Sequence, residues 1–366
     1  MPKPWGEPNK TATGVLNAQG RVDTRDLGRF SEVEPVSGFS AEPGFTLTDN
    51  GDGTLTVTDS QARFGTKPGG GKPLFVFYFG SGSDQPTSLG RIQIPVNWSD
   101  ACFLDAGISR GEASHSMIVD TNVESGDGSN SITTDDSVLQ FDADGSDKFY
   151  RCLINYNDFV ISDLSGTSYN FKTQRWQGND MPDDPHTVNT LQGGSYLFAF
   201  AGDEGGASTM YSANELETKK WRVEEEYNRV SSAAGVNDAG MWGLVDGQLK
   251  FARVSVDSHK GLDPAQTPWQ HFKLGNFRFW APKGQSQWRW HLQYIDNSWC
   301  RVQIKDQNSW DESDEHLVEP QIPQHWEPGS VRFLLKAPAT GLVGRHLWVV
   351  DNDNSKHFIG TWSDSQ

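Results

Sequence analysis

The chain has 366 residues, a formal net charge of -17, and 35% hydrophobic residues. Such an acidic balance argues against duplex nucleic acid as a general partner, because phosphate binding requires a basic surface. No run of eighteen apolar residues occurs, which excludes a membrane-spanning helix at the level of sequence. The length suits two domains, or one large β domain followed by a small one.

Residues 1–35 are polar, with little periodicity, and we expect them to form an N-terminal arm. Two alternating runs then flank Asn50-Gly51-Asp52-Gly53, which predicts a hairpin over residues 46–58. The apolar run Pro73–Phe79 has the length of a strand buried on both faces. Further strands are expected at Leu89–Ile94, Ser116–Val119, Ser137–Phe141, Phe149–Tyr156, Phe159–Ile161, Tyr169–Trp176, Ser195–Phe200, Trp221–Val230 and Met241–Val245.

Strands of this number and spacing, separated by Gly, Asp, Asn and Ser, indicate an all-β sandwich or barrel. A second compact set is expected at Trp299–Lys305, Gln321–Trp326, Ser330–Lys336 and His346–Asp351. Its length suits a separate sandwich of about 70–80 residues. We therefore expect an arm over 1–35, a large β domain over 36–293 and a small β-sandwich over 294–366.

The three cysteines, Cys102, Cys152 and Cys300, are odd in number and widely spaced. This is the pattern of neither a disulfide framework nor a structural zinc site, so we expect buried free thiols.

The run Lys219–Phe251 resembles a recurrent piece of concanavalin-like jelly rolls. The matching residues are Trp221, Glu225, Asn237, Gly240, Trp242, Asp246 and Gly247. The stretch Gly65–Arg91 looks like the first strand of such a domain. Asp296–Gly360 is similar to a small immunoglobulin-like module that follows such jelly rolls in environmental bacterial and phage proteins.

The resemblance implies a concanavalin-like jelly-roll sandwich plus a small C-terminal β-sandwich, directed at a polysaccharide or glycan. It also implies an extracellular protein, either secreted or virion-associated. The first ten residues lack the apolar segment of a secretion signal. Either no signal is needed, the sequence begins after one, or the protein leaves its cell by lysis. Fold alone does not choose among hydrolases, lyases and binding modules.

A hydrolase would need two carboxylates on one strand at a suitable spacing. The triplet Glu224, Glu225 and Glu226 lacks it on either face, and a salt-bridging strand is the structural alternative. A polysaccharide lyase is therefore favoured, although enzymatic activity itself stays uncertain.

β-Elimination from a uronate needs a cation or amide to neutralise the carboxylate and a base to take the proton at C5. The segment Tyr169–Trp176 supplies these residue types, and period-two alternation would place Asn170, Lys172, Gln174 and Trp176 on one face. The candidate catalytic residues are Lys172, Arg175, Tyr169 and His115. The candidate substrate-binding residues are Asn170, Gln174, Trp176, Glu225, Tyr227, Arg110 and Trp242. Pairing of Lys172 and Arg175 with strand carboxylates is the alternative.

Two further expectations remain. No cofactor is required, but the run from Asp142 to Asp147 resembles a calcium loop with Asp142, Asp144 and Asp147 as ligands, and a solvated turn is the alternative. The other class of function is a non-catalytic glycan-binding or virion-surface protein, in which rings such as Trp176 and Trp242 contact sugar and the small sandwich mediates virion or cell-surface assembly.

Overall fold

The computed structural model describes residues 15–18, 36–71, 73, 75–78, 87–93, 102–105, 116–120, 139–157, 170–177, 185–192, 195–200, 207–212, 220–229, 231–233, 235–256, 269–274, 287–336, 338 and 340–364. Side chains are described over 36–68, 71, 73, 147–156, 220–229, 231–233, 235–255, 292, 294–336, 338 and 340–364. The regular elements in these ranges are strands, apart from a short 3-10 helix at Pro68–Gly71. The prediction of an all-β fold is confirmed. No helix in these ranges has the length and apolar character needed to cross a membrane.

A sheet of sixteen strands forms the larger body. The strands are β1 (Val15–Ala18), β5 (Phe75–Tyr78), β6 (Thr87–Gln93), β7 (Cys102–Asp105), β8 (Ser116–Asp120), β9 (Leu139–Ser146), β10 (Lys148–Asn157), β11 (Asn170–Gln177), β12 (Pro185–Gln192), β13 (Ser195–Phe200), β14 (Ala207–Ser212), β15 (Trp221–Arg229), β16 (Ala239–Val245), β17 (Gln248–Val256), β18 (Trp269–Leu274) and β19 (Gln287–Asp296).

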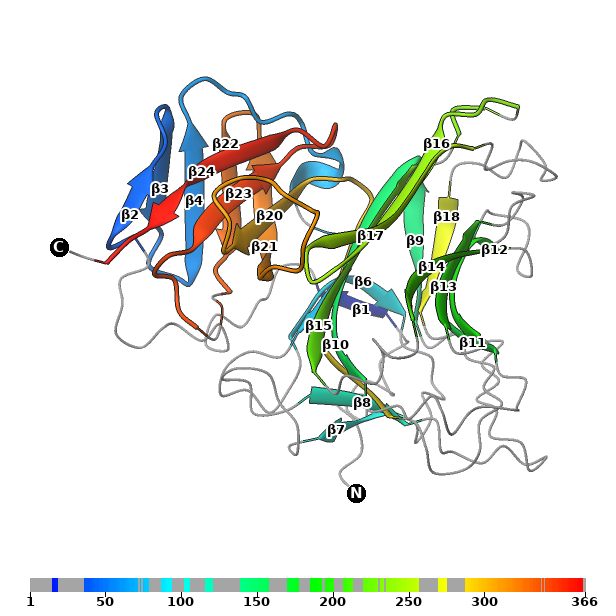
Figure 1. Cartoon of the computed structure of the whole chain (residues 1–366). Coiled ribbons are helices and arrows are strands. Elements are labelled where there is room, and N and C mark those ends of the chain that lie inside the picture. The colour runs from blue at the N-terminus through cyan, green and yellow to red at the C-terminus, as the bar shows by residue number, and fades with distance from the viewer. Residues whose placement is uncertain are drawn as a thin grey trace.

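The order along this large sheet is β14-β13-β12-β11-β18-β9-β6-β5-β19-β10-β15-β16-β17. Its two end strands, β14 and β17, contact each other, so the sheet curls back on itself. Figure 1 shows β10 and β15 on the side next to the smaller body, with β11 to β14 on the opposite side. One face of β10 and β15 therefore packs outward against the smaller body, and the other face points away from it.

An eight-stranded sheet forms the smaller body, in the order β2-β24-β23-β20-β21-β22-β4-β3. The strands are β2 (Phe39–Ala41), β3 (Phe45–Asp49), β4 (Thr54–Asp59), β20 (Arg301–Lys305), β21 (Val318–Glu327), β22 (Ser330–Leu334), β23 (His346–Val350) and β24 (Lys356–Trp362). The end strands β2 and β3 contact each other, which closes the sheet into a small sandwich.

The small sandwich takes strands from both ends of the chain. The expected hairpin over residues 46–58 is present as β3 and β4, but β4 pairs with β22, from Thr54 opposite Leu334 to Thr58 opposite Ser330. Our boundaries assigned residues 36–59 to the large domain, and strand pairing puts them in the small sandwich instead. The physical reason is that the hairpin signal is local, whereas its partner strand lies about 270 residues away along the chain and leaves no trace in the local pattern. An immunoglobulin-like character of this module is not confirmed.

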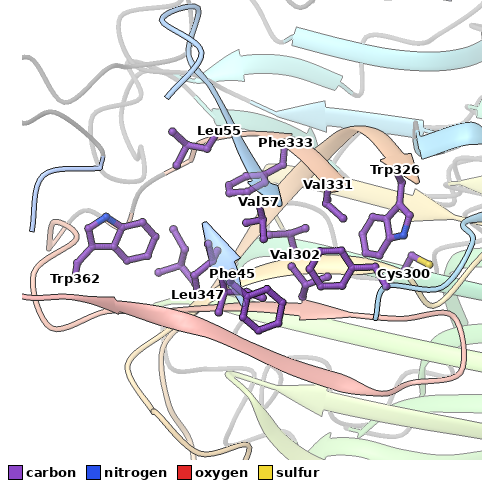
Figure 2. Packing of buried hydrophobic residues seen from close by; sticks show 14 of the residues in the cluster. Phe45, Leu55, Val57, Cys300, Val302, Trp326, Val331, Phe333, Leu347 and Trp362 are labelled. Carbon is purple, nitrogen blue, oxygen red and sulfur yellow. The ribbon is translucent and has the colours of Figure 1, made fainter. Parts of the chain in front are cut away.

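Alternation along the strands builds the core of the small sandwich. Val302 and Ile304 of β20 and Val331 and Phe333 of β22 are all fully buried, each pair two residues apart on its strand. Figure 2 shows the side chains of Val302, Val331 and Phe333 packed with Val57 and other apolar residues from the N-terminal strands. The hairpin is therefore an integral part of this core.

A second apolar core joins the two bodies, and we call it the junction. It combines large-sheet residues with residues of β21 and β22 from the small sandwich. Its members are Tyr150, Cys152, Ile154, Val223, Tyr227, Leu244, Leu292, Tyr294, Trp299, Val318, Ile322 and Leu334. Cys152 lies here and Cys300 lies in the core of the small sandwich, and both are buried free thiols as predicted.

Candidate functional site

Three successive acids of β15 are divided between the two faces of the strand. Glu225 shares a face with Val223 and Tyr227, and this face belongs to the junction. Glu224 and Glu226 lie on the opposite face, and both are fully buried. Because alternation along a strand has period two, the EEE run carries two different environments.

The opposite face forms a cluster of polar side chains with β10. Antiparallel register places Arg151 across from Glu226, and Arg151 Nη1 lies 2.8 Å from Glu226 Oε1. One step further, Asn155 Nδ2 donates to Glu224 Oε1 at 2.6 Å. Asn228 continues the row on β15 and is also fully buried. We call Arg151, Asn155, Glu224, Glu226 and Asn228 the polar face.

Several hydrogen-bonding atoms of the polar face lack a protein partner. They include Oδ1 of Asn155 and both amide atoms, Oδ1 and Nδ2, of Asn228. A buried polar group without a partner costs about 1–3 kcal/mol, so an apolar surface would stabilise the fold better at these positions. A face that carries paired carboxylates next to free amide atoms is suited to a polar, hydroxyl-rich ligand.

Glu225 holds a different set of contacts on the junction side. Its Oε1 accepts a hydrogen bond from the hydroxyl of Tyr150 at 2.6 Å and a second one from Nε2 of Gln303. Burial raises the pKa of Tyr150 well above its usual value, with further contributions from Cys152 and Glu225, so this phenol stays protonated and donates. The acid thus connects the large sheet to the small sandwich.

Two other predicted binding residues also lie in the junction. Tyr227 is stacked on Trp242 with ring centroids 5.2 Å apart, and Trp299 meets Trp242 edge-on at 5.5 Å. The indole of Trp299 donates through Nε1 to the backbone oxygen of Asn228. The structure therefore brings Glu225, Tyr227 and Trp242 together, in packing between the two bodies.

The candidate catalytic and substrate-binding residues between positions 170 and 176 lie on β11, and the structure describes only the backbone of this strand. The pairing of β11 with β12 shifts register between Lys172 and Gln174: Lys172 pairs with Thr190, whereas Gln174 pairs with Asn189. The backbone pairing is therefore irregular within the segment, and the single face expected for Asn170, Lys172, Gln174 and Trp176 stays a prediction. Arg175 pairs with Val188 beyond the shift. Tyr169, His115 and Arg110 lie outside the described residues.

The expected calcium loop coincides largely with a strand. Asp142 and Asp144 belong to β9, where Asp142 pairs with His271 of β18. Asp147 follows the strand and is exposed. Residues 142–146 are therefore strand and not a loop or a turn, because β9 stays paired with β18 through the acidic stretch, from Asp142 opposite His271 to Ser146 opposite Trp269. Among the residues with described side chains, no group of three or more His, Cys, Asp or Glu is placed to hold a metal ion.

The sequence reasoning missed the polar face, except for Glu224 and Glu226, which it read as salt-bridging residues. Arg151 and Asn155 lie two positions on either side of Leu153 in the expected strand Phe149–Tyr156. These two polar residues in a largely apolar strand could have indicated the polar face. Alternation places them on the side of the strand opposite Cys152 and Ile154.

The chain matches no protein-family model and no curated protein. Solved structures similar to it include the alginate lyase Aly36B, at 12% identity and a TM-score of 0.35, over 50% of this chain and 81% of that one. An endo-beta-1,4-glucuronan lyase from the fungus Trichoderma reesei aligns at 10% identity and a TM-score of 0.36, over 60% and 94%. The binding domain of botulinum neurotoxin serotype D aligns at 10% identity and a TM-score of 0.37, over 81% and 79%.

Proposed function

We propose that the chain is a carbohydrate-directed protein that cleaves an acidic polysaccharide by β-elimination on its large sheet, and that a hydroxyl-bearing group of the substrate reaches the buried polar face. The observation that carries this proposal is the pair of buried asparagines with free hydrogen-bonding atoms beside paired charges. Sugar hydroxyls donate and accept at once, as amides do, so they can satisfy both kinds of atom.

The elimination would follow the usual bond changes. A base removes the proton from C5 of the uronate, a C4–C5 double bond forms, and the C4–O bond to the leaving sugar breaks with protonation of that oxygen. Lys172 and Arg175 are proposed to neutralise the carboxylate, and Tyr169 or His115 to move the proton. The resemblance of the chain to jelly-roll proteins supports these assignments.

The test is the ultraviolet absorbance of the new double bond during incubation with alginate, glucuronan and other uronate polymers. We expect absorbance to rise with at least one polymer. Asn228→Ala should lower the rate by about tenfold or more, because a lost pair of ligand hydrogen bonds weakens binding of the transition state. Asn308→Ala, an exposed asparagine of the loop after β20, is the matched control and should leave the rate unchanged.

A binding protein without catalysis is the second candidate. Both carboxylates of the polar face are engaged, Glu226 by Arg151 and Glu224 by Asn155. Engaged acids are suited to recognition more than to proton transfer. A flat absorbance trace over the whole panel, together with binding to a glycan array that Asn228→Ala abolishes, would select this candidate, including a virion-surface or cell-surface role.

A further inference from the structure

The outer face of β20 carries a row of polar side chains that the core does not use. Val302 and Ile304 point into the core of the small sandwich, so Arg301, Gln303 and Lys305 lie on its other face. That face is also buried, and Arg301 and Lys305 are only 2% and 1% exposed. Burying two cations on one strand is costly unless something compensates their charge.

Trp310, in the loop that follows β20, is the centre of this arrangement. Lys305 Nζ lies 3.8 Å from the centre of the Trp310 ring, and the guanidinium carbon of Arg301 lies 5.7 Å from it. A third cation, Lys356 on β24, approaches the same ring to 5.7 Å and is exposed. Cation–π contacts of this kind stabilise such cations only in part, by roughly 0.5–2 kcal/mol.

The three cations lack carboxylate partners among the residues with described side chains. None of them forms an ion pair with a carboxylate there, and Lys305 and Lys356 form no hydrogen bond there. Arg301 donates to the backbone oxygen of Trp299 at 2.9 Å and to Asn354 Oδ1 at 3.3 Å, but its buried Nε has no partner. A buried N–H group of Arg301 therefore has no acceptor, and no hydrogen bond within the described residues engages the ammonium groups of Lys305 and Lys356.

The acids near this group are already bound to neutral donors. Glu225 accepts from Tyr150 and Gln303, and Glu312 accepts from the indole of Trp310 at 2.8 Å. The two other nearby carboxylates accept from backbone amides: Asp306 from Leu317 at 3.1 Å and Asp353 from Ser355 at 2.9 Å. These acids moderate the field of the cations, yet they do not provide the missing acceptor.

We propose that Arg301, Lys305 and Lys356, grouped around Trp310, form a binding site for an oxyanion. A carboxylate, sulfate or phosphate group presents several acceptor oxygens and matches charged donors through short, strong hydrogen bonds. The exposed Lys356 marks the side from which the anion enters. The site lies on the small sandwich and does not depend on the function proposed for the polar face.

The titration of the group agrees with this geometry. Burial lowers the pKa of Lys305 to about 8, against the raising effect of Glu225, Glu312 and Asp306 and with a further lowering by Arg301. Burial and Arg301 also lower the pKa of Lys356, against Glu312 and Asp353. A bound anion would raise both values again, so binding near pH 8 should take up protons, and affinity should fall as the pH rises above 8.

The experiment is calorimetric titration of the full chain with sodium sulfate, with sodium glucuronate and with glucose, in chloride at matched ionic strength. We expect saturable binding of sulfate and no binding of glucose. Lys305→Met and Lys356→Gln should each weaken sulfate binding by about tenfold. Lys220→Gln is the matched control, because Lys220 already pairs with Glu315 at 3.3 Å, and it should leave affinity unchanged.

The Lys356→Gln variant separates loss of sulfate binding from loss of folding. Lys356 is exposed, so its replacement should leave the melting temperature unchanged even if Lys305→Met folds poorly. Absence of sulfate binding, equal binding by all three lysine variants, or equal binding of glucose would overturn the proposal. Glucuronate binding at the same site would identify a saccharide carboxylate as the ligand, and sulfate binding alone would identify an inorganic or ester oxyanion. Loss of uronate elimination with sulfate binding intact would reject the proposed function alone.

Discussion

The two faces of β10 and β15 differ in how completely their polar atoms are satisfied. On the junction side, Glu225 is bound by Tyr150 and Gln303 and surrounded by apolar residues. On the polar face, Arg151 pairs with Glu226 and Asn155 donates to Glu224, but Asn155 Oδ1 and both amide atoms of Asn228 have no protein partner. The difference teaches that the junction side is optimised for packing, whereas the unpartnered polar atoms of the polar face lower the free energy of unfolding. A local loss of folding stability of this kind is typical of a functional surface.

The largest effect should come from the aromatic centre of the junction. Trp299→Ala removes a 6% exposed indole that contacts Tyr227 and Trp242 and bonds to the backbone of Asn228. We expect the free energy of unfolding to fall by about 3–5 kcal/mol. Chemical denaturation measures this, and a loss under about 1 kcal/mol would show that the two bodies are not coupled through this core.

Glu225→Ala should follow in size. It leaves the buried hydroxyl of Tyr150 without its acceptor and leaves Gln303 Nε2 only the hydroxyl oxygen of Tyr150, 3.4 Å away, which should lower the free energy of unfolding by about 2–3 kcal/mol. The double variant Glu225→Leu with Tyr150→Phe should recover part of that loss, because the hydroxyl that lost its acceptor is removed together with the carboxylate. No recovery in the double variant would mean that the hydrogen bond is not the source of the effect.

Lys305→Met should change how stability depends on pH. The folded-state pKa of Lys305 is about 8, below its usual 10.5, so between these values the unfolded chain binds more protons at this site. Relative to the variant, the wild-type chain should therefore gain roughly 1 kcal/mol per pH unit from pH 8 to 10 and nothing below pH 8. Denaturation of both chains across pH 7 to 10 checks this, and a constant difference would contradict the lowered pKa.

Lys220→Gln should have the smallest effect. Lys220 pairs with Glu315 and Asp246 at the surface, with its side chain 45% exposed. Exposed pairs contribute about 0–1 kcal/mol, and salt screens them. A larger loss of thermal stability, unchanged by added salt, would show that the loop from residue 306 to 317 is held more tightly than its surface contacts suggest.

The sequence predicted what depends on local pattern. Alternation identified the strands around Tyr150, Trp221 and Val302, and the Asn-Gly-Asp-Gly run identified the β3–β4 hairpin. It could not show that this hairpin pairs with β22, because strand pairing is set by long-range packing. It also could not show the register shift within β11, since a bulge keeps the same residue types and changes only their partners.

The candidate site was predictable to a smaller extent. Glu225, Tyr227 and Trp242 were all predicted as substrate-binding residues and do lie together, yet their neighbours Trp299 and Gln303 come from a distant part of the chain. That distant part decides that they are packed between two bodies. Arg151 and Asn155 are polar positions in the largely apolar β10, whereas Glu224, Glu226 and Asn228 lie in a mostly polar strand, and only the antiparallel register of β10 and β15 brings the two sets together.

The most direct test of the difference between the two faces is Asn228→Ala, assayed for both stability and uronate elimination. The side-chain amide of Asn228 has no protein partner, so the account predicts a change in the free energy of unfolding under about 1 kcal/mol, with elimination or glycan binding reduced about tenfold or more. A large loss of stability with full activity per folded molecule would contradict it, because the polar face would then serve the fold and not a ligand.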